Sequence, residues 1–159
     1  MKTPEYLLRF ILFLALAITF SSCDRGGPVY QKSLKMKNST WDRFDMKLFE
    51  FAVDDTTKNY DIALVVNCTE SFPYDNLPVY VILTTPSGEE RMREVTLRVR
   101  ENNKLSIEPE SKKAEARVVL WKGIAMSQKG KCKISIENMI PKIQTEGIDE
   151  IGIMVTESK

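Results

Sequence analysis

The three cysteines, Cys23, Cys68 and Cys132, are the most reactive side chains of this 159-residue sequence, which contains no histidine. Without histidine the chain lacks the commonest general base and metal ligand, and it has no Ser-His or Cys-His nucleophile. Cys68 and Cys132 are far apart in the sequence and do not form the closely spaced pair of a zinc site. We therefore predict no catalytic residue, no metal site and no cofactor.

Acid-base chemistry would have to use carboxylates, and two adjacent acidic pairs are available. Asp54-Asp55 and Glu89-Glu90 both fall in expected turns. A hydrolase with two carboxylates needs them on opposite sides of a cleft, whereas acidic residues in turns usually contact solvent or the local backbone. The segment around Asp54-Asp55 also lacks the Asp-x-Asp-x-Asp-Gly pattern of a calcium loop. We predict that the protein is not an enzyme.

Cys23 follows a short segment with the properties of an export signal. Basic residues precede an uncharged apolar stretch over 10–20, and Ser21-Ser22 lead directly to Cys23. This order is typical of a signal peptide, and the apolar stretch is too short to span a bilayer. The small residues before the cysteine are similar to a bacterial lipobox, although Phe20 stands where leucine is usual. We predict a signal peptide over 1–22 that is removed on export, and lipidation of Cys23.

The rest of the chain has the size of one domain. Residues 23–40 comprise the lipidated cysteine and a polar segment with Gly26-Gly27-Pro28, which we expect to act as a flexible tether before a folded domain over 41–159. The signal peptide takes two basic and one acidic residue from totals of 23 and 22, so the mature chain carries no net charge. We expect the membrane as a partner, through the lipid, and no nucleic acid.

Short apolar segments separated by turn residues predict an all-β fold. The period of two is clearest in 131–136, where polar residues alternate with Cys132, Ile134 and Ile136. The pattern favours an antiparallel β-sandwich of about seven strands. In the fifth strand, Val118 and Leu120 should share one face, and Val119 and Trp121 the other. The expected strands are 46–53, 60–68, 78–85, 92–100, 116–122, 131–136 and 151–156.

Two features of the folded part leave alternatives open. Export would place Cys68 and Cys132 where a disulfide can persist, but both also suit strand faces as small buried side chains. Aromatic residues could form an exposed sugar-binding platform or belong to the core. Solvent exposure of Trp41, Tyr74 and Trp121 discriminates between these two interpretations.

Several blocks along the folded part together carry a family resemblance. The most specific are Phe72-Pro73-Tyr74-Asp75-Asn76-Leu77 and Gly147-Ile148, and the others are Trp41, Phe49, Phe51, 55–60, Asn67, 86–88, Gly130, 136–139 and 151–153. With these blocks the chain resembles the gliding-motility lipoprotein H (GldH-type) family, although 102–115 and 138–141 depart from its pattern. The resemblance implies an outer-membrane lipoprotein, facing the periplasm or the cell surface, that is needed for gliding. It also implies a link to type IX secretion, with other envelope or gliding-machinery proteins as partners.

Two turns could carry recognition or modification. The residue types of the 72–77 loop suit a structural turn, and the competing hypothesis is that Tyr74, Asp75 and Asn76 are presented to a partner protein. Asp55-Thr56-Thr57 also suits a turn, but it is similar to the sites at which some of these bacteria O-glycosylate exported proteins, which makes Thr56 a candidate acceptor. We expect a lipid-anchored, non-enzymatic envelope component, with a surface glycan-binding β-sandwich lipoprotein as the alternative.

Overall fold

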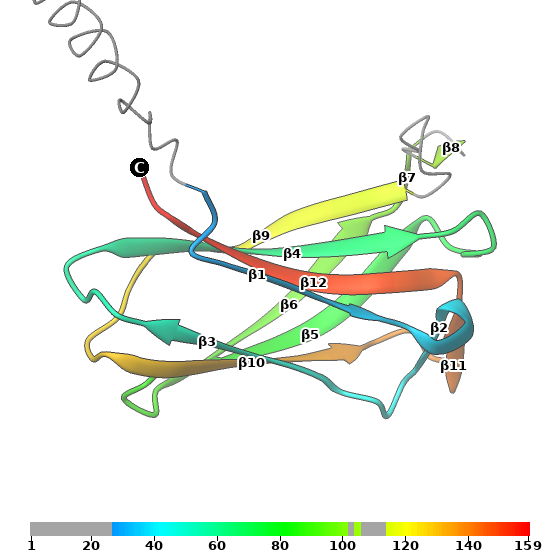
Figure 1. Ribbon diagram of the computed structural model, residues 1–159. Coiled ribbons are helices and arrows are strands. Elements are labelled where there is room, and N and C mark those ends of the chain that lie inside the picture. The colour runs from blue at the N-terminus through cyan, green and yellow to red at the C-terminus, as the bar shows by residue number, and fades with distance from the viewer. Residues whose placement is uncertain (1–26, 102–103, 106–113) are drawn as a thin grey trace, which may run out of the picture.

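Two four-stranded antiparallel sheets face each other in the computed structural model, which describes residues 27–101, 104–105 and 114–159 (Figure 1). The first sheet has the strand order β1-β12-β4-β9, the second has β3-β10-β5-β6, and two short ribbons pair β11 with β2 and β7 with β8. A 3-10 turn, η2 (Lys37–Ser39), follows the first strand. The strands are β1 (Tyr30–Lys35), β2 (Thr40–Asp42), β3 (Lys47–Val53), β4 (Asn59–Cys68), β5 (Asn76–Thr84), β6 (Glu90–Arg98), β7 (Arg100–Glu101), β8 (Lys104–Leu105), β9 (Ala114–Ala125), β10 (Gly130–Asn138), β11 (Gln144–Glu146) and β12 (Ile148–Glu157).

The expected all-β antiparallel sandwich is confirmed. All seven expected strands are present, as β3, β4, β5, β6, β9, β10 and β12. The period of two orients β3 as expected, with Phe49, Phe51 and Val53 buried between the sheets. The expected signal peptide over 1–22 and the lipidation site Cys23 lie outside the described residues.

The centre of the core lies between strands β4 and β12 of the first sheet and strands β10 and β5 of the second. Ile62, Leu64 and Val66 of β4 are fully buried, and they lie opposite the buried inward residues of β12 in antiparallel register. Burying one such aliphatic side chain stabilises a fold by about 1.5–3 kcal/mol. The long apolar run of β4 follows from its central position.

Side-chain contacts close the two lateral sides of the sandwich. On one side, the rings of Tyr30 in β1 and Phe51 in β3 lie 5.7 Å apart between centroids. On the other side, Arg93 of β6 donates a hydrogen bond of 2.6 Å to the carbonyl of Leu120 in β9 and lies over the ring of Trp121. These contacts cover sheet edges whose unpaired backbone groups could otherwise pair with another chain.

The expectation of a flexible tether over 23–40 is wrong for its second half. Tyr30–Lys35 forms β1, which pairs along its whole length with β12, and the backbone N–H of Met36 donates to the carbonyl of Asp149. The strand is difficult to recognise in the sequence because a strand at the edge of a sheet buries few of its side chains. Only Tyr30 and Leu34 are partly buried, so the apolar period of two is too weak to recognise.

A β-bulge changes the facing of residues expected in the fifth strand. The register of β9 against β4 shifts on both sides of Ile62, which lies opposite Trp121, while Ala63 lies opposite Val119. Leu120 therefore has no partner residue, and both Leu120 and Trp121 are buried while Val119 is 51% exposed. The expectation that Val119 and Trp121 share a face is wrong because an inserted residue reverses the alternation of faces beyond it.

The two cysteines of the folded part are free thiols, so the disulfide alternative is not formed. Cys68 is the last residue of β4, whereas Cys132 lies near the start of β10, opposite Phe51, at the other end of the sandwich. Both side chains are fully buried, and burial raises the pKa of Cys68 to about 12 and that of Cys132 to about 11. Buried neutral thiols of this kind are poor nucleophiles.

This burial predicts the behaviour of both thiols toward a maleimide. Cys68 and Cys132 of the native protein should remain unmodified at neutral pH and should both react after unfolding in urea. Peptide mapping by mass spectrometry after each treatment measures the modification. Recovery of a peptide that links the two cysteines under non-reducing conditions would contradict the assignment.

Candidate interaction site

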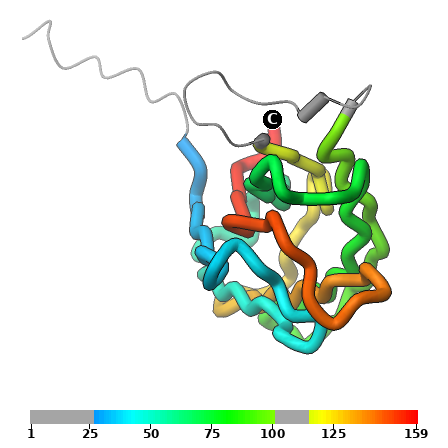
Figure 2. The backbone as a smooth tube through the Cα atoms, turned by 90° about the vertical axis from the view of Figure 1, so that its right-hand side faces the viewer, coloured from blue at the N-terminus to red at the C-terminus, as the bar shows by residue number. Residues whose placement is uncertain are grey.

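One end of the sandwich joins three segments that are far apart in the sequence. The backbone N–H of Gly147, between β11 and β12, donates to the carbonyl of Ser39, just before β2. The carbonyl of Gly147 in turn accepts a hydrogen bond from the N–H of Thr69, just after β4. Both bonds are 2.8 Å long. Figure 2 views the molecule from this end, which we call the ribbon end because it carries the β2-β11 ribbon.

Gly147 is also in direct contact with the backbone of Phe72. Its φ angle is +83°, and a Cβ atom at this position would lie 2.1 Å from the nitrogen and 2.3 Å from the Cα of Phe72. Both the backbone conformation and the space therefore require glycine. This contact joins the two blocks that are most specific to the family resemblance.

The backbone of the loop that follows Phe72 is held from one neighbouring segment. The carbonyl of Asp75 accepts hydrogen bonds from the N–H groups of Val99 and Arg100, at 2.8 and 3.1 Å. The guanidinium of Arg100 donates to the carbonyls of Phe72 and Glu70. With Phe72 itself fully buried, the loop is a rigid part of the ribbon end.

The three residues expected to contact a partner differ in their exposure. Tyr74 is half-buried, with its ring packed edge-on against Phe72 at 5.7 Å between centroids and the Nζ of Lys142 at 5.8 Å from its own ring centroid. Asp75 and Asn76 are exposed, and within the described ranges neither side chain makes a hydrogen bond or an ion pair.

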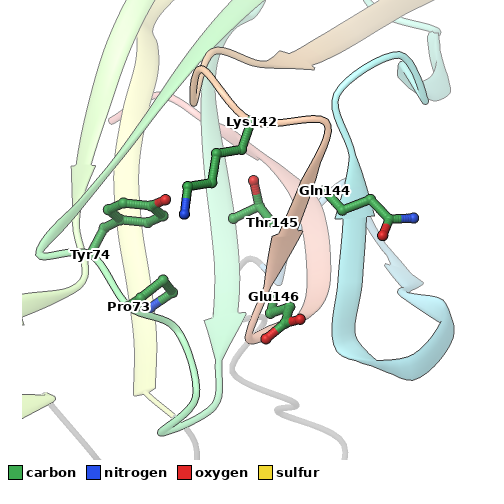
Figure 3. A pocket seen from close by; sticks show the side chains of 6 residues that line it. All are labelled: Pro73, Tyr74, Lys142, Gln144, Thr145 and Glu146. Atoms are coloured by element: carbon green, nitrogen blue, oxygen red, sulfur yellow. The ribbon is translucent and has the colours of Figure 1, made fainter.

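Tyr74 and Lys142 line a shallow pocket together with Pro73, Gln144, Thr145 and Glu146 (Figure 3). Its volume of about 180 Å³ is below the roughly 300–1,000 Å³ of typical small-molecule sites. The pocket is large enough for a single side chain of another protein. Sequence reasoning identified Tyr74 but missed the β10–β11 residues, because nothing in their local pattern indicates a contact with the 72–77 loop.

The sequence of the chain also matches the model of a known protein family. The sequence model of the GldH lipoprotein family matches residues 28–155, which is most of the chain. This chain belongs to the GldH lipoprotein family. The resemblance expected from the sequence is therefore confirmed, and with it the assignment to a family of lipoproteins. Family membership implies a location in the cell envelope, anchored to a membrane.

The gliding motility lipoprotein GldH of Flavobacterium johnsoniae is 33% identical to this chain over 78 residues, which are 49% of this chain and 47% of that protein. Solved structures are less similar. The Clostridium perfringens CspB protease matches with a TM-score of 0.43 and 11% identity, over 82% of this chain and 26% of that one. A family GH115 4-O-methyl-alpha-glucuronidase matches with a TM-score of 0.45 and 15% identity, over 83% of this chain and 18% of that one. Likenesses of this size give no basis for transferring an activity.

Buried polar contacts account for further family blocks at the ribbon end of this GldH-family protein. Trp41 is fully buried, and its indole N–H donates to the carbonyl of Asp45 at 2.8 Å. The side-chain amide of Asn138 donates to the hydroxyl of Thr145 at 2.8 Å and accepts a hydrogen bond from the N–H of Ile140 at 3.0 Å. Because unpaired buried polar groups are costly, this network fixes the chain between β10 and β11.

The acidic pairs at the opposite end have local partners. Asp55 accepts hydrogen bonds from the N–H and the hydroxyl of Thr57, and these bonds lower the pKa of Asp55. The ion pair with Arg91 lowers the pKa of Glu89. A two-carboxylate hydrolase needs one carboxyl with a raised pKa to act as the acid, and these two shifts go the other way. No group of three potential metal ligands and no helix able to span a membrane occurs among the described residues.

Thr56 lies in the turn between β3 and β4, next to Asp55, and is partly exposed. The neighbouring Thr57 is exposed, and its hydroxyl donates a hydrogen bond to Asp55. O-glycosylation of Thr56 stays a prediction.

The exposed aromatic platform required for the glycan-binding alternative is not formed by the residues expected for it. Trp41 and Trp121 are buried in the core, and only Tyr74 is partly exposed. Phe44 is the most exposed aromatic residue of the described part, at 82%. A row of stacking rings would need several such side chains side by side.

The Gly147 contact predicts a large difference between two glycine variants. Gly147→Ala should destabilise the fold by about 3 kcal/mol or more, since backbone strain adds to a clash with Phe72. Gly88→Ala is the matched control, because Gly88 has φ +84° with open space around it, and should cost only about 1 kcal/mol. Urea unfolding measures both free energies. Equal losses would show that the close approach to Phe72 is not a constraint.

Proposed function

We propose that this protein is a lipid-anchored, non-enzymatic component of the gliding machinery, held at the outer membrane by acyl chains on Cys23, and that it acts by binding another envelope protein. Membership of the GldH lipoprotein family supports this role. The observation that carries the proposal is the 72–77 loop, whose backbone is held by hydrogen bonds at Phe72 and Asp75 while the side chains of Asp75 and Asn76 are exposed.

Backbone groups fix the conformation of the 72–77 loop, which leaves its exposed side chains available for recognition. Its conformation depends on the carbonyl of Asp75, which any residue type would supply, and not on the Asp75 carboxylate. The carboxylate is free to pair with a cation of a partner, next to the amide of Asn76 and the half-buried ring of Tyr74. Rigid loops with exposed polar groups and an aromatic ring lose little entropy on binding, which favours recognition.

The chemical composition of the protein supports a non-enzymatic role. The chain has no histidine. Hydrogen bonds and an ion pair hold the pKa values of Asp55 and Glu89 low, so that neither suits a general acid. We therefore propose that the protein acts by presenting a binding surface at a fixed place in the envelope.

The role of the 72–77 loop in binding a partner can be tested without disturbing the fold. A double variant, Asp75→Ala with Asn76→Ala, should change the free energy of unfolding by less than about 0.5 kcal/mol, as is usual for exposed positions, and should abolish colony spreading. The matched control is Asp54→Ala with Asn59→Ala, the same exposed residue types at the opposite end, which should spread normally. Normal spreading of the Asp75/Asn76 variant at wild-type protein levels would reject this loop as the binding site.

The lipid anchor has a separate test. Cys23→Ser should prevent palmitate incorporation, release the protein from the outer-membrane fraction and abolish gliding, because no other segment replaces the acyl chains. Radiolabelled palmitate, membrane fractionation and colony spreading give the three measurements. Retention of the variant in the outer membrane together with wild-type spreading would exclude anchoring through this residue.

A further inference from the structure

An exposed group of lysines begins nine residues after the expected anchor, Cys23. It consists of Lys32 and Lys35 on β1 and Lys37 in η2, all of which are exposed, and we call it the basic strip. The sequence from 25 to 41 contains Arg25 and these three lysines and no acidic residue.

The lysines of the basic strip also differ from other lysines of the described residues in their ion pairs. Several lysines elsewhere are paired, Lys58 with Glu157 and both Lys131 and Lys133 with Glu50. Within the described part of the chain, no ion pair joins Lys32, Lys35 or Lys37 to a carboxylate. Glu150 lies opposite Lys35 in the register of β12 and places one negative charge beside the strip, although its carboxylate forms no ion pair with Lys35 and accepts a hydrogen bond from Asn67 on the next strand. With three lysines and this one neighbouring carboxylate, the strip keeps a net positive charge.

The strip follows the outer edge of the first sheet, with Lys32 and Lys35 projecting from opposite faces of the edge strand β1. β1 is the outermost strand of the first sheet (Figure 1) and lies beside β3 of the second, where Tyr30 and Phe51 are in contact. Lys32 lies opposite Ile153, and its side chain is nevertheless exposed because no further strand of its own sheet covers this edge. The opposite lateral side is formed by β6 and β9.

Because the folded part begins with β1 at Tyr30, the β1 edge of the sandwich lies close to the expected anchor at Cys23. Between Cys23 and Tyr30 only the six residues 24–29 remain, so the fully extended connection is about 25 Å long. Lys32 follows two residues later. A lysine held this near to a bilayer can come within a Debye length of its surface, about 8 Å at physiological salt, where each basic residue is attracted to anionic headgroups.

We propose that the basic strip docks on the anionic phospholipid headgroups of the membrane that holds the anchor, so that the β1–β3 side of the sandwich lies on the bilayer. The proposal rests on the lipid anchor at Cys23. The ribbon end then points along the membrane plane, because β1 runs from the anchored Tyr30 toward that end. Asp75 and Asn76 would face a partner in the same membrane.

Lipid-quenching fluorescence of the lipidated, full-length protein tests this orientation. A fluorophore is placed on the β1 side through Gln31→Cys, or on the opposite side through Glu94→Cys; both positions are exposed, and the buried Cys68 and Cys132 do not label. The protein is reconstituted in phosphatidylcholine vesicles, with or without phosphatidylglycerol, that carry a headgroup quencher. We expect about fivefold or more stronger quenching at position 31 in anionic vesicles, since one lysine at such a surface already shifts an equilibrium by roughly this factor.

The triple variant Lys32→Gln, Lys35→Gln and Lys37→Gln should remove the difference, as should about 1 M salt, where the Debye length falls to about 3 Å. The matched control replaces the exposed Lys122, Lys129 and Lys159 by glutamine and should keep the difference. Equal quenching at the two positions, or loss of the difference in the control triple alone, would overturn the proposal. Failure of lipidation is recognised separately, because the protein then no longer floats with either kind of vesicle.

Discussion

The close approach of Gly147 to the backbone of Phe72 is the constraint on which the ribbon end depends. Through this contact and the hydrogen bonds of Gly147, the start of β12, the end of β4 and the segment before β2 are held at fixed positions. A side chain at position 147 would separate the β4–β5 loop from the β11–β12 turn. The loop would then lose its place beside Lys142, although the two sheets could still form.

The same constraint explains why recognition and structure are combined in one block. Phe72 and Leu77 are buried and anchor the two ends of the loop, while Asp75 and Asn76 between them face solvent. A loop whose ends are core residues cannot move far, so its exposed groups keep a fixed spacing.

The sequence was sufficient for the sandwich and insufficient for its edges. Strands such as β10, with Cys132, Ile134 and Ile136 facing inward, carry a complete alternating pattern and could be predicted. β1 could not, because β12 supplies its hydrogen bonds and it buries almost nothing. The bulge at Leu120 and the free state of the cysteines depend equally on tertiary register, which no local pattern encodes.

The candidate site was predictable to a similar extent, since Tyr74, Asp75 and Asn76 were recognisable in the sequence while Lys142 and the pocket were not. The strand β1, which the sequence pattern did not indicate, has the largest consequence for the proposed function. Under the proposed lipidation of Cys23, a tether extending to residue 40 would let the domain move far from the membrane, whereas the six residues before β1 would keep it closer to the surface. Because the proposed anchor precedes β1 and the ribbon end follows it, a short tether with an attached basic strip would fix the direction in which the 72–77 loop points. An envelope component that acts by contact alone depends on that direction, since its partner can approach only along or above the same membrane.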